Sequence, residues 1–196
     1  DSLPLFHACA SEEPVFRRLA DPVRRAHSIR SRSHQLLLIV EGAADLRDGQ
    51  RVTGDGVTLV PVHTPGHASD HLCYYLPEER ALFSGDLILN GSTSVIPDGD
   101  GDLGLYMDSL RRLRSLELDA LCPGHGPVVS DPSAKLHEYI SHRLDRERRL
   151  LEALDSGLRT EDELLDAAWS EVPEHLRPAA ALTLAVDRDL ASPLLD

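Results

Sequence analysis

Two histidines and one aspartate lie in glycine-containing turns of a kind that can carry metal-binding side chains. The segments are Thr64-Pro65-Gly66-His67, Ser84-Gly85-Asp86 and Pro123-Gly124-His125-Gly126. Two imidazoles and a carboxylate form a nitrogen and oxygen donor set that suits zinc, and that manganese or iron can also use. Each motif alone is common, and a single loop histidine is more often an ordinary surface residue. Their ordered occurrence along one chain is what indicates a metal site.

Each of these turns follows a short apolar run of strand length. The runs are Val57–Val62, Ala81–Phe83 and Leu118–Cys122. Strand ends are rigid, and glycine in the following loop permits positive φ and close approach of the backbone. The pattern therefore predicts strands that deliver the three side chains to loops where they can converge.

The elements around these strands indicate an α/β fold. Two more apolar runs, Leu36–Val40 and Leu72–Leu76, are bounded by turn signals and suit buried strands. A helix is predicted over 103–116, with Asp102 as its N-cap. Residues 1–34 are expected to be polar and either helical or irregular.

The last third of the chain is predicted to be helical throughout. Asp131-Pro132 opens a long helix that ends at Ser156-Gly157, and Thr160 with Glu163 forms a capping box for the next one. The long helix is expected to have one apolar face and one charged face. The apolar face comprises Leu136, Ile140, Leu144, Leu151 and Leu154, and the other comprises Arg143, Asp145, Arg146, Glu147, Arg148 and Arg149.

Composition narrows the class of protein. The net charge of −13 disfavours non-specific binding to nucleic acid. No apolar run approaches the roughly 18 residues of a membrane helix, and no signal peptide is visible. Three cysteines, an odd number, suit a reducing compartment better than a disulfide scaffold. We expect a cytoplasmic protein that acts on a small molecule, and the sequence leaves its oligomeric state open.

The ordered motifs resemble the last three signature motifs of the metallo-β-lactamase superfamily. The segments Thr64–His71 and Tyr139–Arg143 are similar to the β-lactamase-like protein 2 branch of that superfamily. The resemblance implies a metallo-β-lactamase αββα sandwich over residues 1–150, with its N-terminal part absent. It also implies a small helical, winged-helix-like domain over residues 151–196.

The same resemblance implies roles for individual residues. His67 would bind one of two zinc ions, His125 the other, and Asp86 would bridge both and orient the nucleophile. Hydroxide held between metals ~3.5–4 Å apart would then attack an ester or thioester. Asp70 and His71 are candidates for fixing the imidazole tautomers.

One motif of the superfamily is missing from the sequence. None of the ten histidines forms an H-x-H pair, and the H-x-H-x-D-H motif supplies four metal ligands in the family. We expect it upstream of Asp1; the alternative is a degenerate relative without a competent metal site. The 196 residues expressed alone are therefore predicted to be poorly stable and inactive.

Three functions remain open at this point. The favoured one is a zinc-dependent hydrolase of a small ester or thioester. The second is a single-strand-directed endoribonuclease, an activity that the resemblance implies, with arginines at 111–114 and 143–149 as phosphate contacts. The acidic total and the scarcity of aromatic residues for base stacking count against it. The third is a metal-free binding domain without catalytic activity.

Overall fold

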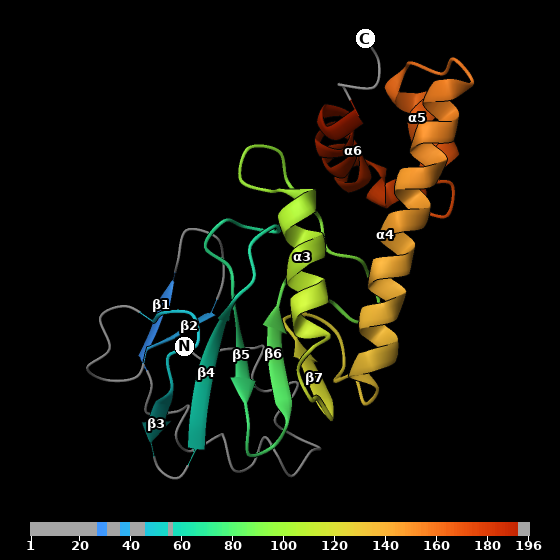
Figure 1. Ribbon diagram of the computed structural model, residues 1–196. Helices are drawn as coiled ribbons and strands as arrows, with labels where there is room; N and C mark the ends of the chain where they lie inside the picture. The colour runs from blue at the N-terminus through green and yellow to red at the C-terminus, as the bar shows by residue number, and fades with distance from the viewer. Residues whose placement is uncertain (1–26, 31–35, 40–45, 55–56, 192–196) are drawn as a thin grey trace.

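A mixed five-stranded sheet forms the centre of the fold, and helices lie along it and beyond it (Figure 1). The computed structural model describes residues 27–30, 36–39, 46–54 and 57–191. The strands are β1 (His27–Arg30), β2 (Leu36–Ile39), β3 (Val52–Gly54), β4 (Val57–His63), β5 (Leu72–Leu76), β6 (Ala81–Gly85) and β7 (Ala120–Pro123). The helices are α3 (Leu103–Leu113), α4 (Pro132–Asp155), α5 (Glu161–Ala168), the 3-10 turn η1 (Glu174–Leu176) and α6 (Arg177–Ala191).

Strand direction places three strand ends at the same edge of the sheet. The strand order is β3-β4-β5-β6-β7, in which β3 to β6 pair antiparallel in succession and β7 pairs parallel with β6. Helix α3 lies in the crossover that this parallel pair requires. Because β4, β6 and β7 therefore run in the same direction, their carboxyl ends point to one edge.

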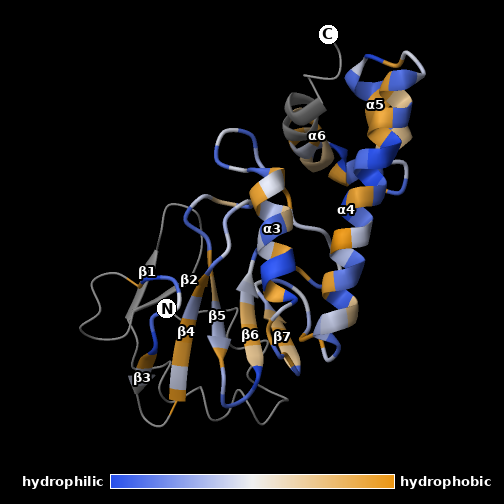
Figure 2. Cartoon of the chain, viewed as in Figure 1, coloured by the Kyte–Doolittle hydropathy of each residue, from blue (hydrophilic) through white to orange (hydrophobic). Residues whose placement is uncertain are grey.

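A first hydrophobic cluster, the sheet core, joins the sheet, α3 and the first half of α4. Figure 2 shows hydrophobic segments of these elements in orange. The helix predicted over this region is present, and four of its apolar residues are buried in this core: Leu103, Met107, Leu110 and Leu113. Asp102 caps this helix by accepting a hydrogen bond from the backbone N–H of Leu105 at 2.8 Å, as predicted. Tyr106, on the same helix, is fully buried.

A second hydrophobic cluster, the tail core, joins the second half of α4 to α5 and α6. Its fully or almost fully buried members include Leu150, Leu154, Leu164, Trp169 and Leu184. Helix α4 thus contributes side chains to both cores, and the domain boundary predicted at residue 150 falls inside it. None of the described helices is both long enough and apolar enough to cross a membrane.

Several boundaries differ from the prediction. Residues 27–30 form strand β1, so the expectation of helical or irregular structure is wrong there, because pairing with β2 determines it; the rest of 1–34 lies outside the described residues. Strand β3 was not predicted, since three residues carry too little pattern. The last strand begins at Ala120, two residues late, and α3 ends at Leu113 in a tightened turn.

The charged face predicted for α4 is partly wrong. Arg143 and Arg146 are 4% and 3% exposed, whereas Leu144 is 47% exposed. The guanidinium groups lie over the rings of Tyr106 and Trp169, at 5.1 and 4.9 Å from the ring centroids. These aromatic partners come from other elements, so the spacing along α4 alone does not indicate them.

The winged-helix part of the predicted fold is not confirmed. The described tail is helical, as expected, with the capping box between Thr160 and Glu163 present. No strand follows β7 in the described residues up to 191. Helix α6 extends to Ala191, and residues 192–196 are outside the described range.

Candidate metal centre

The three candidate ligands follow the three strand ends that share one edge of the sheet. His67 lies in the loop after β4, Asp86 directly follows β6, and His125 lies two residues after β7. Since β4, β6 and β7 run in the same direction, the fold delivers all three residues to the same side. This arrangement follows from the strand topology and needs no helix to carry the ligands.

Asp86 and His125 are brought together directly. His125 Nε2 lies 3.5 Å from Asp86 Oδ1, with the imidazole 64% and the carboxylate 26% exposed. The neighbouring glycine makes this possible: a Cβ atom at Gly124 would lie only 2.8 Å from Asp86 Oδ1. A side chain at that position would push the carboxylate away from the imidazole.

His67 is oriented by a backbone carbonyl. Its Nδ1 lies 2.7 Å from the carbonyl oxygen of Val95. A carbonyl can only accept, so Nδ1 carries the proton and Nε2 keeps the lone pair that a metal needs. Ser94 Oγ lies 3.3 Å from the same Nδ1 and donates to the carbonyl oxygen of Asp86 at 2.7 Å. His67 and Asp86 are therefore linked through Ser94.

The segment of residues 86–96, here called the 86–96 loop, contacts all three candidate ligands. It begins at Asp86, bonds His67 near its end, and donates from the Asn90 N–H to the His125 carbonyl oxygen at 3.1 Å. Three buried side chains from the helices donate hydrogen bonds to backbone carbonyl oxygens of the loop. Tyr106 donates to Leu87, Tyr139 to Leu89 or Ser92, and Arg143 to Ser94.

His71 is fully buried beside Gly85. Its Nδ1 lies 2.8 Å from Thr64 Oγ1, and that hydroxyl donates to Cys73 Sγ at 3.3 Å. Burial, with the nearby charges of His67 and His63, lowers the pKa of His71 to about 4, so its imidazole is neutral near pH 7. Gly85, at φ +51°, is required here, because a Cβ atom would lie 3.0 Å from His71 Nε2.

The two residues predicted to fix the tautomers have different surroundings. The ring of His71 meets that of His67 edge-on at 6.2 Å between centroids. Asp70 is exposed, and the role predicted for each stays a prediction. The carbonyl that orients His67 belongs to Val95, which the sequence did not single out; a backbone carbonyl has no sequence signal. Tyr139 and Arg143 stand in the motif similar to the β-lactamase-like protein 2 branch.

The donor chemistry fits a divalent metal, although the set is small. Within the described part of the chain, no group of three or more His, Cys, Asp or Glu residues is close enough to hold a metal ion. What the structure does show is an aspartate and a histidine in contact, and a second histidine with its Nε2 lone pair directed by a fixed tautomer. These features suit part of a metal centre.

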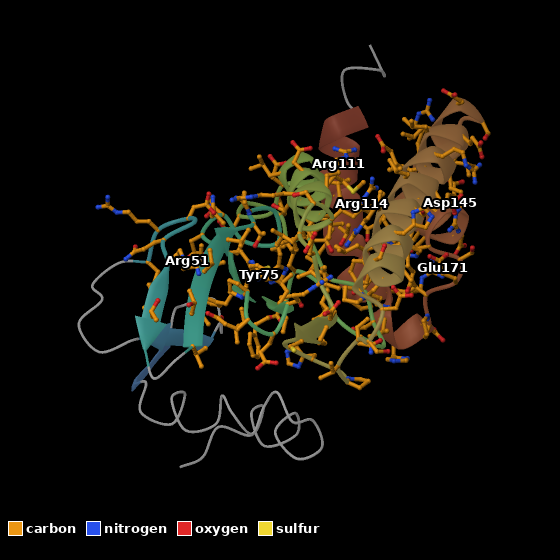
Figure 3. All side chains as sticks on the ribbon, turned by 60° about the horizontal axis from the view of Figure 1, so that its bottom comes forward. Arg51, Tyr75, Arg111, Arg114, Asp145 and Glu171 are labelled. Atoms are coloured by element: carbon orange, nitrogen blue, oxygen red, sulfur yellow. The ribbon has the colours of Figure 1, made fainter. Side chains whose placement is uncertain are left out.

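Apart from Arg114, which is exposed at the end of α3, the arginines considered for phosphate binding are engaged within the fold. On α4, Arg148 contacts Asp145 and Glu152, and Arg149 contacts Asp145 and Glu171. Figure 3 labels the two acidic residues Asp145 and Glu171. On α3, Arg111 pairs with Asp108 at 2.8 Å, and Arg112 pairs with Asp48 at 2.9 Å. With Arg143 and Arg146 buried, this geometry gives no support to a phosphate-binding surface on these helices.

Comparisons with known proteins agree with the motifs and the fold. The chain is 41% identical over 134 residues to a beta-lactamase-like protein 2 homolog from Caenorhabditis elegans, covering 68% of this chain and 44% of that protein. It is 36% identical over 166 residues to an atrochrysone carboxyl ACP thioesterase from Aspergillus chevalieri, covering 76% of this chain and 53% of that protein. The chain thus spans about half the length of these curated relatives.

Solved structures show the same fold. A metallo-beta-lactamase family protein from Thermus thermophilus superposes with a TM-score of 0.65 at 24% identity, covering 94% of this chain and 62% of that one. A beta-lactamase domain protein from Burkholderia ambifaria gives 0.67 at 20% identity, covering 80% and 48%. The family profile of the metallo-beta-lactamase superfamily matches residues 17–125, which include all three candidate ligands. The chain belongs to the metallo-beta-lactamase superfamily.

Proposed function

We propose that this chain is part of a metal-dependent hydrolase in which His67, Asp86 and His125 hold divalent metal, with zinc the first choice and manganese or iron the alternatives. The observation that carries the proposal is the shared sheet edge. There Asp86 and His125 lie in contact, and the Val95 carbonyl sets the His67 tautomer that leaves Nε2 unprotonated.

The residues of this chain would bind the metal ions and fix the orientation of the ligands. When bound, a pair of such metals supplies Lewis acidity, which polarises an acyl carbonyl and makes water nucleophilic at neutral pH. Asp86 would bridge the two sites, because its carboxylate already faces His125 and its backbone is tied to His67 through Ser94. His67 and His125 would each contribute one neutral imidazole.

The proposed substrate is a small ester or thioester. The support is the similarity to a relative named as an acyl carrier protein thioesterase, with 36% identity over 76% of this chain. Fold and metal site are shared by many chemistries, so the substrate must be tested directly. The buried thiol of Cys73, which forms no disulfide, supports the proposal of a cytoplasmic, reducing location.

The test is turnover and metal content of the natural full-length protein. We expect elemental analysis to find zinc, and acyl-pantetheine thioesters to release free thiol at a rate that a chelator abolishes and zinc restores. Asp86→Asn should lower kcat/KM about a hundredfold or more, since a metal contributes several kcal/mol to the transition state. Asp108→Asn, which removes an exposed ion pair on α3, should leave kcat/KM unchanged.

Each alternative function has its own outcome in this test. A metal-replete protein that cleaves no thioester or ester but binds and cuts single-stranded RNA in a salt-dependent way would replace the proposal with the endoribonuclease. A purified protein free of zinc, manganese and iron would replace it with the metal-free binding domain. An Asp86→Asn variant as active as the parent would remove Asp86 from the metal centre.

A further inference from the structure

Two side chains from the C-terminal helices bond successive peptide groups of the 86–96 loop. Arg143, on α4, donates from Nη2 to the carbonyl oxygen of Ser94. Thr183, on α6, accepts at Oγ1 from the backbone N–H of Ile96 at 3.4 Å. Both side chains are buried, at 4% and 3% exposure. The segment between them is therefore held from two helices that are distant in sequence.

This same segment sets the orientation of His67. The carbonyl of Val95, which accepts from His67 Nδ1, belongs to the same peptide group as the N–H of Ile96. Thr183 and His67 therefore bond to the two ends of one planar peptide. Hydrogen bonds in such a chain polarise one another, so the bond to Thr183 strengthens the carbonyl as an acceptor for His67.

Arg143 holds the preceding peptide in an unusual way for a buried cation. No carboxylate contacts its guanidinium in the described part of the chain; its partners are the Ser94 carbonyl and the face of Tyr106. Its Nη1 has no hydrogen-bond partner among those residues. Burying a guanidinium on such terms is costly. This cost is better explained by a need to fix the loop than by the stability of α4.

We infer that Arg143 and Thr183 are positioning residues for His67, through which the C-terminal helices orient a ligand of the metal centre. The inference rests on the proposed function for the presence of a metal. It assigns the C-terminal helices a role in orienting a metal ligand, whereas the fold alone suggested that they form an appended domain. The orientation of His67 itself, however, is a property of the protein without metal.

The experiment uses matched substitutions in the natural full-length protein. Thr183→Val replaces the hydroxyl with a methyl group of the same size, and Thr183→Ser keeps the hydroxyl. Arg143→Met removes the donor on α4, while Arg148→Met removes an exposed arginine from the same helix. Zinc affinity is measured by competition with a chromophoric chelator. The His67 tautomer is read from imidazole ¹⁵N shifts in the metal-free protein, at a pH where imidazoles are neutral.

We expect Thr183→Val and Arg143→Met to weaken zinc binding about 10–100-fold, the range found when partners behind metal ligands are removed. Both should also populate the second His67 tautomer. Thr183→Ser and Arg148→Met should match the parent in both measurements. A purely structural role would lower thermal stability and leave the tautomer and the zinc affinity of the folded protein unchanged.

The possible failures are distinguishable. If Thr183→Val folds and keeps both the parent's zinc affinity and its single tautomer, the inference is wrong, whatever Arg143→Met does. If the parent takes up none of zinc, manganese and iron, the proposed function fails, and the tautomer comparison still decides whether the helices orient His67. Should Arg143→Met not fold, the outcome rests on the Thr183→Val and Thr183→Ser pair, which differs by one hydroxyl and one methyl.

Discussion

Replacing Tyr139 with phenylalanine isolates the contribution of one oxygen atom to the 86–96 loop. The phenol accepts from the Leu89 N–H at 2.9 Å and faces the carbonyl oxygens of Leu89 and Ser92 at 2.9 and 2.8 Å. Burial raises the pKa of Tyr139, so the phenol keeps its proton at neutral pH. Tyr139→Phe therefore removes one accepted and one donated hydrogen bond and leaves no large cavity. It also leaves the backbone N–H of Leu89 without its hydrogen-bond partner.

The expected loss follows from these two bonds. The donated bond contributes about 0.5–1.5 kcal/mol net, and the unsatisfied Leu89 N–H costs about 1–3 kcal/mol, so we expect a loss of at least about 2 kcal/mol. For a chain of this size that lowers Tm by roughly 4–8 °C. The assay is urea unfolding, in which the midpoint should fall while the slope m stays constant.

The matched control is Tyr74→Phe on strand β5. Tyr74 is 8% exposed, and its hydroxyl has no hydrogen-bond partner in the described residues. Removing that hydroxyl should leave the free energy of unfolding unchanged or raise it. Equal losses from the two substitutions would refute the reasoning, because they would show that the contacts of Tyr139 with the loop carry no stability of their own.

Three further predictions concern single residues. Burial alone would raise the pKa of Glu171, but the hydrogen bond from Arg146 lowers it to about 2. The stabilising contribution of the ionised carboxylate is therefore present above the unfolded pKa near 4.5 and is lost as the pH falls towards 2. Glu171→Gln should flatten the dependence of Tm on pH in that window. Gly124→Ala should displace the Asp86 carboxylate and weaken zinc binding about tenfold or more. Burial raises the pKa of Cys73 to about 12, so thiol alkylation followed by mass spectrometry should find it modified only on unfolding.

Each of these has its own control or contrary outcome. Glu147→Gln on α4 should leave the pH dependence of Tm as it is, and a Glu171→Gln variant with the parent's profile would contradict the assigned pKa. Gly104→Ala lies in the first turn of α3, where the added Cβ meets only the Asp102 carboxylate at 3.3 Å; it should not affect zinc binding. Rapid alkylation of Cys73 in the native protein would show that β5 opens locally.

The strands and the turns that carry His67, Asp86 and His125 were predictable because their signals are local. Apolar runs mark buried strands, and glycines mark the turns after them. The pairing of β1 with β2 was not predictable, since it depends on a partner strand. Nor was the burial of Arg143, because in sequence it belongs to an arginine-rich face and only the ring of Tyr106 from α3 reveals its surroundings.

The orienting contact on His67 could not be predicted from the sequence at all. It comes from the carbonyl of Val95, and every residue has a carbonyl. Only the folded path of the 86–96 loop, fixed by side chains of α3 and α4, decides which carbonyl faces the imidazole. The residue types of the candidate site are thus visible in sequence, while the groups that orient them depend on tertiary structure.

The continuity of helix α4 determines how the protein opens. This one helix contributes Leu136 and Ile140 to the sheet core and Leu150 and Leu154 to the tail core. Both cores therefore share one continuous helix, and neither can unfold independently of it. Amide hydrogen exchange along the middle of α4 should therefore require loss of both cores, and its protection should approach the global value. The tail and the sheet would then unfold as a single cooperative unit, so a substitution that destabilises the tail core would also destabilise the strand ends.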